Sequence, residues 1–211
     1  MSNIASTLLD ICQEVANQLG KNNGDVADTK RDTAIKRARR RFYKEYPWSF
    51  TKKSDTITFA SGVAGFPSDY DTNFEPKIYS YSGVLKKEYK LVPLEDVSGY
   101  TTDIPVFAID YGNSQFVTNL DSAPNITYHI RVSSDMSNTS VIEPCDDISA
   151  IVSLSVALYW LLSERNDDMF KMFKADYDTE IDRLIKEDAK KSPVRRFRDD
   201  NNGYGFGDLD E

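Results

Sequence analysis

The feature of this sequence that most constrains its fold is the order in which two hydrophobic periodicities follow one another. Apolar residues recur every three or four positions over residues 3–19 and again over about 28–46, a spacing typical of amphipathic helices. Over residues 49–143 the apolar residues alternate with polar ones, as they do in half-buried strands. The helical spacing returns over 148–162 and over about 166–191. The chain is therefore expected to form two helices, a β region and two further helices.

This order predicts the α+β class: a predominantly helical bundle of two N-terminal and two C-terminal helices, with an inserted antiparallel β domain and an extended C-terminal tail. Turn residues separate the strand candidates, with no alternation of strands and helices. The expected domains are an N-terminal helical pair at 1–48, a β-rich insert at 49–143, a C-terminal helical pair at 144–191 that packs on the first pair, and an extended tail at 192–211.

Individual elements follow from the same spacing. The helix over 148–162 is apolar on several sides, which predicts a central position in the core, and Asp146 and Asp147 suit its N-terminal end. The last helix should bury Met169, Met172, Phe173, Tyr177, Ile181, Leu184 and Ile185. The strand candidates are residues 56–59, 77–81, 88–92, 106–111, 115–119 and 126–132.

Few residues of this chain suit catalysis or metal binding. Cys12 and Cys145 are too few for a disulfide framework or a four-thiolate zinc site, and we expect both to be small buried hydrophobes. His129, the single histidine, lies on the polar side of a strand candidate, where we expect an exposed side chain. We therefore predict no enzymatic activity, no cofactor and no metal site.

Charge and hydropathy limit the classes of partner. The chain carries 26 basic and 34 acidic residues, a net charge of −8, which argues against a protein that wraps nucleic acid with its whole surface. Its N-terminus lacks the basic stretch of a secretory signal, and its longest apolar run is too short for a bilayer. We expect a soluble cytoplasmic protein with no membrane partner.

A concentrated positive surface lies on the second helix. Arg37, Arg40, Arg41 and Lys44, here called the basic stripe, recur at helical spacing nearly opposite the apolar residues of that helix. Three interpretations stay open, in this order: a contact with an acidic protein surface such as another copy of the chain, a solvated helix face, and a nucleic-acid contact.

The C-terminal segment, residues 193–211, has neither the helical nor the strand periodicity, and it mixes arginines, glycines and aromatics. We expect it to be disordered alone. It either orders on a partner or is a frayed terminus without function. Its candidate contact residues are Arg195, Arg196, Phe197, Arg198, Tyr204 and Phe206.

Four features together resemble the head–tail connector, or adaptor, proteins of tailed bacteriophages. The two N-terminal helices end in an aromatic, tryptophan-containing step at 42–50, and the β-rich region carries a Gly-Phe-Pro-Ser-Asp-Tyr turn at 65–70. Pro144 precedes a helix of small and apolar residues at 150–162. An acidic break then precedes a helix with Asp-Tyr-Asp at 176–178.

The resemblance covers about residues 3–190 and implies a structural virion protein. It implies a ring beneath the portal, with twelve copies as the expected number, that extends the DNA channel toward the tail. The implied partners are the portal protein, other copies of the chain, the next tail or adaptor protein, and double-stranded DNA passing through the channel. The C-terminal tail would dock on the portal. The implied locations are the head–tail junction of the virion and, during assembly, the host cytoplasm.

Two other functions are compatible with the residues. The first is a nucleic-acid-binding module that uses the basic helix at 36–44. The second is a β-sandwich that binds a glycan or another ligand through tyrosines of the β region, namely Tyr79, Tyr81, Tyr100 and Tyr111.

Overall fold

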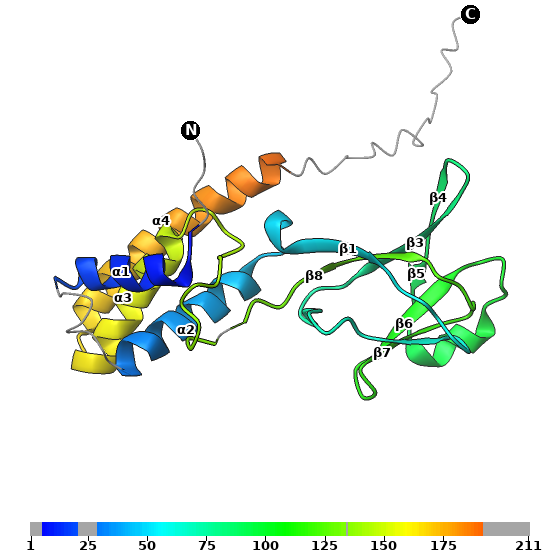
Figure 1. Cartoon of the computed structure of the whole chain (residues 1–211), viewed down its shortest axis with the longest axis horizontal. Coiled ribbons are helices and arrows are strands. Elements are labelled where there is room, and N and C mark those ends of the chain that lie inside the picture. The colour runs from blue at the N-terminus through cyan, green and yellow to red at the C-terminus, as the bar shows by residue number, and fades with distance from the viewer. Residues whose placement is uncertain (1–5, 21–28, 134, 192–211) are drawn as a thin grey trace, which may run out of the picture.

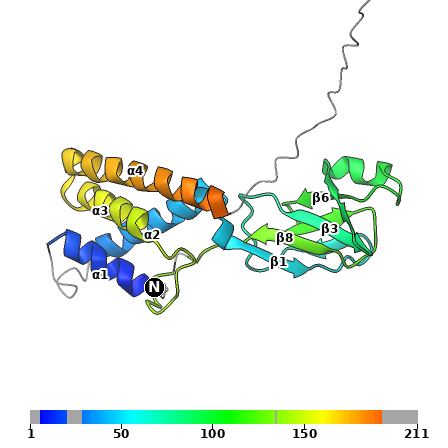
Figure 2. The same ribbon diagram turned by 90° about the horizontal axis from the view of Figure 1, so that it is seen from above.

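The computed structural model describes residues 6–20, 29–133 and 135–191, and these residues form a mixed α+β fold. Four α-helices, here called the helical part, lie at one end of the molecule, and two four-stranded sheets lie at the other (Figure 1). The same separation is visible from above (Figure 2). The α+β class predicted from the sequence is confirmed. Within the described residues, no helix is both long and apolar enough to cross a membrane.

The first two helices are bounded by local signals. Helix α1 (Leu8–Gln18) starts at a capping box, in which the Thr7 N–H donates to the Asp10 carboxylate at 2.6 Å and the Asp10 N–H donates to the Thr7 hydroxyl at 3.3 Å. The expected start at residue 3 was therefore too early, because the cap rather than the apolar spacing decides where this helix begins. Helix α2 (Thr29–Glu45) ends just before Pro47, which cannot continue a helix.

Helix α3 (Ser149–Glu164) contacts α1, α2 and α4 and is the central element of the helical part. Asp147 lies just before its start, and its Oδ1 accepts the N–H of Ser149, the first helical residue, at 3.0 Å. Helix α4 (Asp167–Lys191) buries Tyr177, Ile181 and Leu184. Met172, also predicted to be buried, is 49% exposed. It lies about 140° around the helix from Tyr177, outside the narrow stripe that packs on the core.

An aromatic stack closes the helical part where α2 leads into the first strand. The ring of Trp48 lies between those of Phe42 and Phe50, with centroid distances of 4.7 and 5.3 Å. The Trp48 side chain is fully buried, and its indole N–H donates to the Phe42 carbonyl at 3.0 Å. This stack fixes the path by which the chain leaves the helices.

The two sheets share one core. Ile78, Ile126 and Tyr128 of the first sheet pack with Phe107 and Phe116 of the second. The first sheet contains, in spatial order, β1 (Lys52–Thr56), β8 (Asn125–His129), β3 (Lys77–Ser82) and β4 (Leu85–Glu88), and all its pairs are antiparallel. The second contains β2 (Val63–Gly65), β7 (Gln115–Thr118), β6 (Val106–Asp110) and β5 (Lys90–Leu91).

Several strand predictions need correction. Strand β5 pairs with β6 in parallel, through a crossover that contains the short 3-10 helix Leu94–Gly99, so the expected purely antiparallel arrangement is wrong. The candidate at 88–92 is divided between β4 and β5, which lie in different sheets. Strand β2 was not predicted, and β1 lies N-terminal to the candidate at 56–59. These errors share one cause: strand pairing depends on partners distant in sequence, which local alternation does not encode.

His129 is half-buried rather than exposed. Its ring lies 5.0 Å from the Phe74 ring centroid, and its Nδ1 is hydrogen-bonded to the Thr51 hydroxyl at 2.8 Å. Burial, with a contribution from the charge of Lys52, lowers the pKa of His129. The residue therefore packs where β8 meets the short 3-10 helix Ser49–Thr51, which a single alternating strand could not predict.

Candidate functional site

A surface groove with a volume of about 1430 Å³ lies between α1 and α4. Its lining also includes Val152 and Ser153 near the start of α3, and Trp48 and Phe50. One lysine, Lys191, lies on its wall. We call it the acidic groove because eight carboxylates line it: Asp10, Glu14, Asp146, Asp147, Asp176, Glu180, Glu187 and Asp188.

Helical spacing on two separate helices builds this groove. Asp10 and Glu14 are four residues apart on α1, and Asp176, Glu180 and Glu187 recur at four and seven residues on α4. Residues so spaced lie on one face of a helix. Since α1 and α4 both pack on α3, their acidic faces border the same space.

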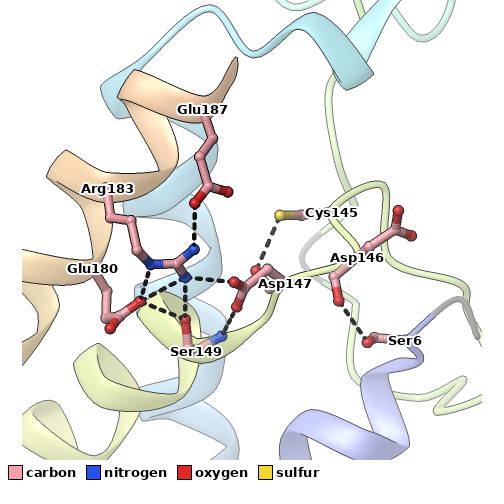
Figure 3. Close-up of polar contacts among 8 residues, drawn as sticks. All are labelled: Ser6, Cys145, Asp146, Asp147, Ser149, Glu180, Arg183 and Glu187. Carbon is pink, nitrogen blue, oxygen red and sulfur yellow. Dashed lines mark hydrogen bonds and ion pairs between the residues drawn. The ribbon is translucent and has the colours of Figure 1, made fainter. Parts of the chain in front are cut away.

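Part of the negative charge is neutralised by Arg183 of α4 (Figure 3). The Arg183 guanidinium is paired with Asp147 at 2.5 Å, with Glu180 at 2.7 Å and with Glu187 at 2.9 Å. Hydrogen bonds to these three carboxylates raise the pKa of Arg183. Although burial opposes it, the hydrogen bonds from Arg183 and Ser149 lower the pKa of Asp147. Arg183 thereby joins the start of α3 to α4 and holds one wall of the groove in place.

The remaining carboxylates divide into structural and exposed groups. Asp10 caps α1, and Asp188 accepts hydrogen bonds from the backbone N–H and the hydroxyl of Ser49. Glu14, Asp146 and Asp176 are exposed. In Figure 3 the Asp146 side chain lies apart from the Arg183 cluster. These three exposed carboxylates are available to a partner.

The basic stripe lies on the exposed side of α2. Arg37, Arg40, Arg41 and Lys44 are all exposed, whereas the opposite side of the helix is buried. Arg41 is the most constrained of the four. Its guanidinium lies 3.6 Å from Glu45 and 5.8 Å from the centroid of the Tyr177 ring on α4. The basic stripe predicted from helical spacing is therefore exposed to solvent. The side chains of its other three residues, Arg37, Arg40 and Lys44, extend from α2.

A buried charged cluster next to the stripe was missed by the sequence analysis. Arg39 and Glu143 are 1% and 2% exposed, with Nη2 and Oε1 2.7 Å apart. The pair lacks hydrogen-bond geometry, and Nε and Nη1 of Arg39 meet no acceptor among the described residues. The Tyr43 hydroxyl donates to Glu143 Oε2 at 2.6 Å, and burial together with that carboxylate raises the pKa of Tyr43. Arg39 stands four residues after Ile35, so its place on the apolar face was readable in the helical spacing.

This cluster positions the backbone of the returning chain. It fixes Glu143 against α2 at the point where the chain returns from the sheets to the helical part. Among the described residues, no group of three or more histidine, cysteine or acidic side chains is arranged to hold a metal ion.

The two cysteines are buried, as expected. Burial raises the pKa of Cys12, and burial raises the pKa of Cys145 to about 12. The Cys145 thiol also donates to the Asp147 carbonyl at 3.1 Å. Neither side chain has the electropositive, accessible surroundings of a reactive thiolate.

We expect neither cysteine to react with iodoacetamide in the folded protein at mildly alkaline pH, because the thiolate is the reactive species and is disfavoured at both positions. Intact-mass spectrometry after alkylation should find no added group on native protein and two after denaturation. Rapid alkylation of native Cys145 would contradict its burial.

The other candidate residues are not brought together. Tyr79 and Tyr81 are neighbours on β3, with ring centroids 5.6 Å apart. Tyr111 directly follows β6 in the second sheet. Tyr100 packs against a small buried cluster formed by Val92, Val97, Val106 and Ala108. The tail residues Arg195, Arg196, Phe197, Arg198, Tyr204 and Phe206 lie outside the described residues. No protein-family model and no curated protein matches the chain.

Proposed function

We propose that this protein is a structural component of a tailed-phage virion, a head–tail adaptor that forms a ring beneath the portal and extends the DNA channel to the tail. In this proposal, residues 1–48 and 144–191 form one helical bundle, residues 49–143 are an insert that meets neighbouring tail proteins, and residues 192–211 reach the portal. The protein acts by holding its neighbours, without transforming a substrate.

The observation that carries this proposal is the presence of two oppositely charged surfaces on the helical part. The basic stripe is exposed on α2, and the acidic groove is lined by α1 and α4. A chain that presents both signs of charge on separate faces is suited to repeated contacts with like copies. The helix–helix–β–helix–helix order that resembles phage adaptors agrees with this function.

The overall charge of −8 also agrees with a DNA channel. DNA must pass through an adaptor without binding tightly to its wall. A surface dominated by carboxylates repels phosphates, whereas a basic wall would bind DNA through counterion release.

The experiment that tests this function is binding to the portal protein encoded in the same genome. Full-length chain should co-sediment with portal rings at a fixed stoichiometry, and electron microscopy should reveal an added annulus. Deletion of residues 193–211 should weaken binding at least about tenfold, because loss of one buried aromatic anchor has an effect of that size.

A control keeps the tail length but removes its anchors, with Phe197, Tyr204 and Phe206 all changed to alanine. This variant should bind as weakly as the deletion. Undiminished binding by both variants would refute the role of the tail. Absence of any complex between portal rings and the full-length chain would refute the adaptor function.

A further inference from the structure

We infer that the acidic groove of one copy receives the basic stripe of the next copy, so that the exposed face of α2 in each subunit packs over the groove between α1 and α4 of its neighbour. This inference rests on the proposed ring and names the contact that would build it. The occupant of the groove is thus a second copy of this chain.

The first argument is that one copy cannot satisfy both surfaces by itself. On α4, Tyr177 and Lys174 lie on the side of α2: the Tyr177 hydroxyl donates to Glu45, and the Arg41 guanidinium lies over the Tyr177 ring. The carboxylates of α4 that line the groove, such as Asp176, project from a different side of the same helix. Helix α4 therefore separates the stripe from the groove within a subunit, and only another molecule can bring them together.

The second argument is chemical complementarity. Arg37, Arg40 and Lys44 offer exposed cations at helical spacing, and Glu14, Asp146 and Asp176 offer exposed carboxylates around the groove. Arginine forks pair well with carboxylates. Phe173, a partly buried apolar residue in the lining of the groove, can contact the aliphatic stems of these long side chains.

The third argument is size. The stripe occupies about two turns of α2, or roughly 10–12 Å along the helix axis at 1.5 Å per residue. The groove volume of about 1430 Å³ has room for the long side chains that project from this face of the helix. The exposed face of α2 is therefore a suitable occupant.

This contact joins two different surfaces and is consequently heterologous. Heterologous contacts between identical subunits close into rings or extend into filaments, whereas a self-complementary contact stops at a dimer. Because exposed ion pairs are individually weak and screened by salt, the assembly should be salt-sensitive and should strengthen when a portal ring gathers the copies.

The test uses charge reversal at exposed positions only. The stripe variant carries Arg37→Glu, Arg40→Glu and Lys44→Glu, and the groove variant carries Glu14→Lys, Asp146→Lys and Asp176→Lys. Arg41 and the carboxylates bound to Arg183 are left unchanged because they hold the fold. A control variant carries Lys52→Glu, Lys77→Glu and Lys90→Glu on the exposed sheet surface. It makes the same change in net charge as the stripe variant.

Sedimentation velocity at low salt should detect oligomers of the full-length wild type and of the control. Each of the stripe and groove variants should self-associate at least about tenfold more weakly. Mixing the two variants, or combining all six substitutions in one chain, should restore association, because the complementary charges are then exchanged. Circular dichroism should find every variant folded.

Three outcomes would overturn the inference. One is a wild type that stays monomeric at low salt and forms no ring on portal. A second is a mixture of the two variants that does not recover association. A third is a stripe variant that loses duplex-DNA binding but keeps wild-type self-association, which would assign the stripe to nucleic acid. Portal binding by the tail is measured separately, so failure of the adaptor function is distinguishable from failure of this contact.

Discussion

Replacing Arg39 with alanine is expected to lower the free energy of unfolding by about 3–5 kcal/mol. Arg39 and Glu143 are buried side chains whose charges face each other 2.7 Å apart. Removal of the guanidinium leaves the Glu143 carboxylate without a counter-charge in the interior. The carboxylate is then held by the hydrogen bond that its other oxygen accepts from the Tyr43 hydroxyl. Denaturant unfolding followed by circular dichroism measures the change.

The control for this prediction removes both charges together. The triple variant Arg39→Met, Glu143→Leu and Tyr43→Phe should recover most of the lost stability, since replacing a buried ion pair by apolar side chains of similar size is often neutral or stabilising and the Tyr43 hydroxyl, which donates to Glu143, is removed with it. A loss below about 1 kcal/mol in Arg39→Ala would be typical of an exposed pair and would contradict the buried geometry.

Trp48→Ala is the second substitution with a large expected effect, also about 3–5 kcal/mol. It removes a fully buried ring that stacks between Phe42 and Phe50, and it removes the indole hydrogen bond to the Phe42 carbonyl. The midpoint of thermal unfolding, read from the helical signal in circular dichroism, should fall by about 10 °C for a chain of this length.

Trp48→Phe provides the matched control, because it keeps a stacking ring and loses mainly the hydrogen bond, which contributes on the order of 1 kcal/mol. It should therefore be clearly more stable than Trp48→Ala. Equal losses in the two variants would mean that the stacked ring is not the source of the stability.

Both substitutions act where the chain passes between the helices and the sheets. Trp48 lies on the outgoing segment, and the next residue, Ser49, is hydrogen-bonded to Asp188 at the end of α4. Glu143 lies on the returning segment and is held by Arg39 and Tyr43 of α2. The two crossings are thus each anchored by a buried contact with the helical part. In the proposed ring, these anchors would transmit the position of the helices to the sheets.

The sequence by itself determined the helices and several of the strands. Their signals are local: a spacing of three to four residues marks α2, α3 and α4, and alternation marks β3, β6, β7 and β8. The basic stripe also followed from spacing, because all four of its residues lie on one helix. The position of Arg39 on the apolar face of α2 could have been predicted from the same spacing.

Only the tertiary structure decided which distant residues meet. The parallel pairing of β5 with β6, the division of 88–92 between two sheets, and the burial of Glu143 against Arg39 all depend on partners far apart in the sequence. The acidic groove has the same origin, since Glu14 on α1 and Asp176 on α4 border one space only because both helices pack on α3. Periodicity reports which face of an element is buried, whereas a groove or a sheet register is set by packing and hydrogen bonds between elements, which no local pattern contains.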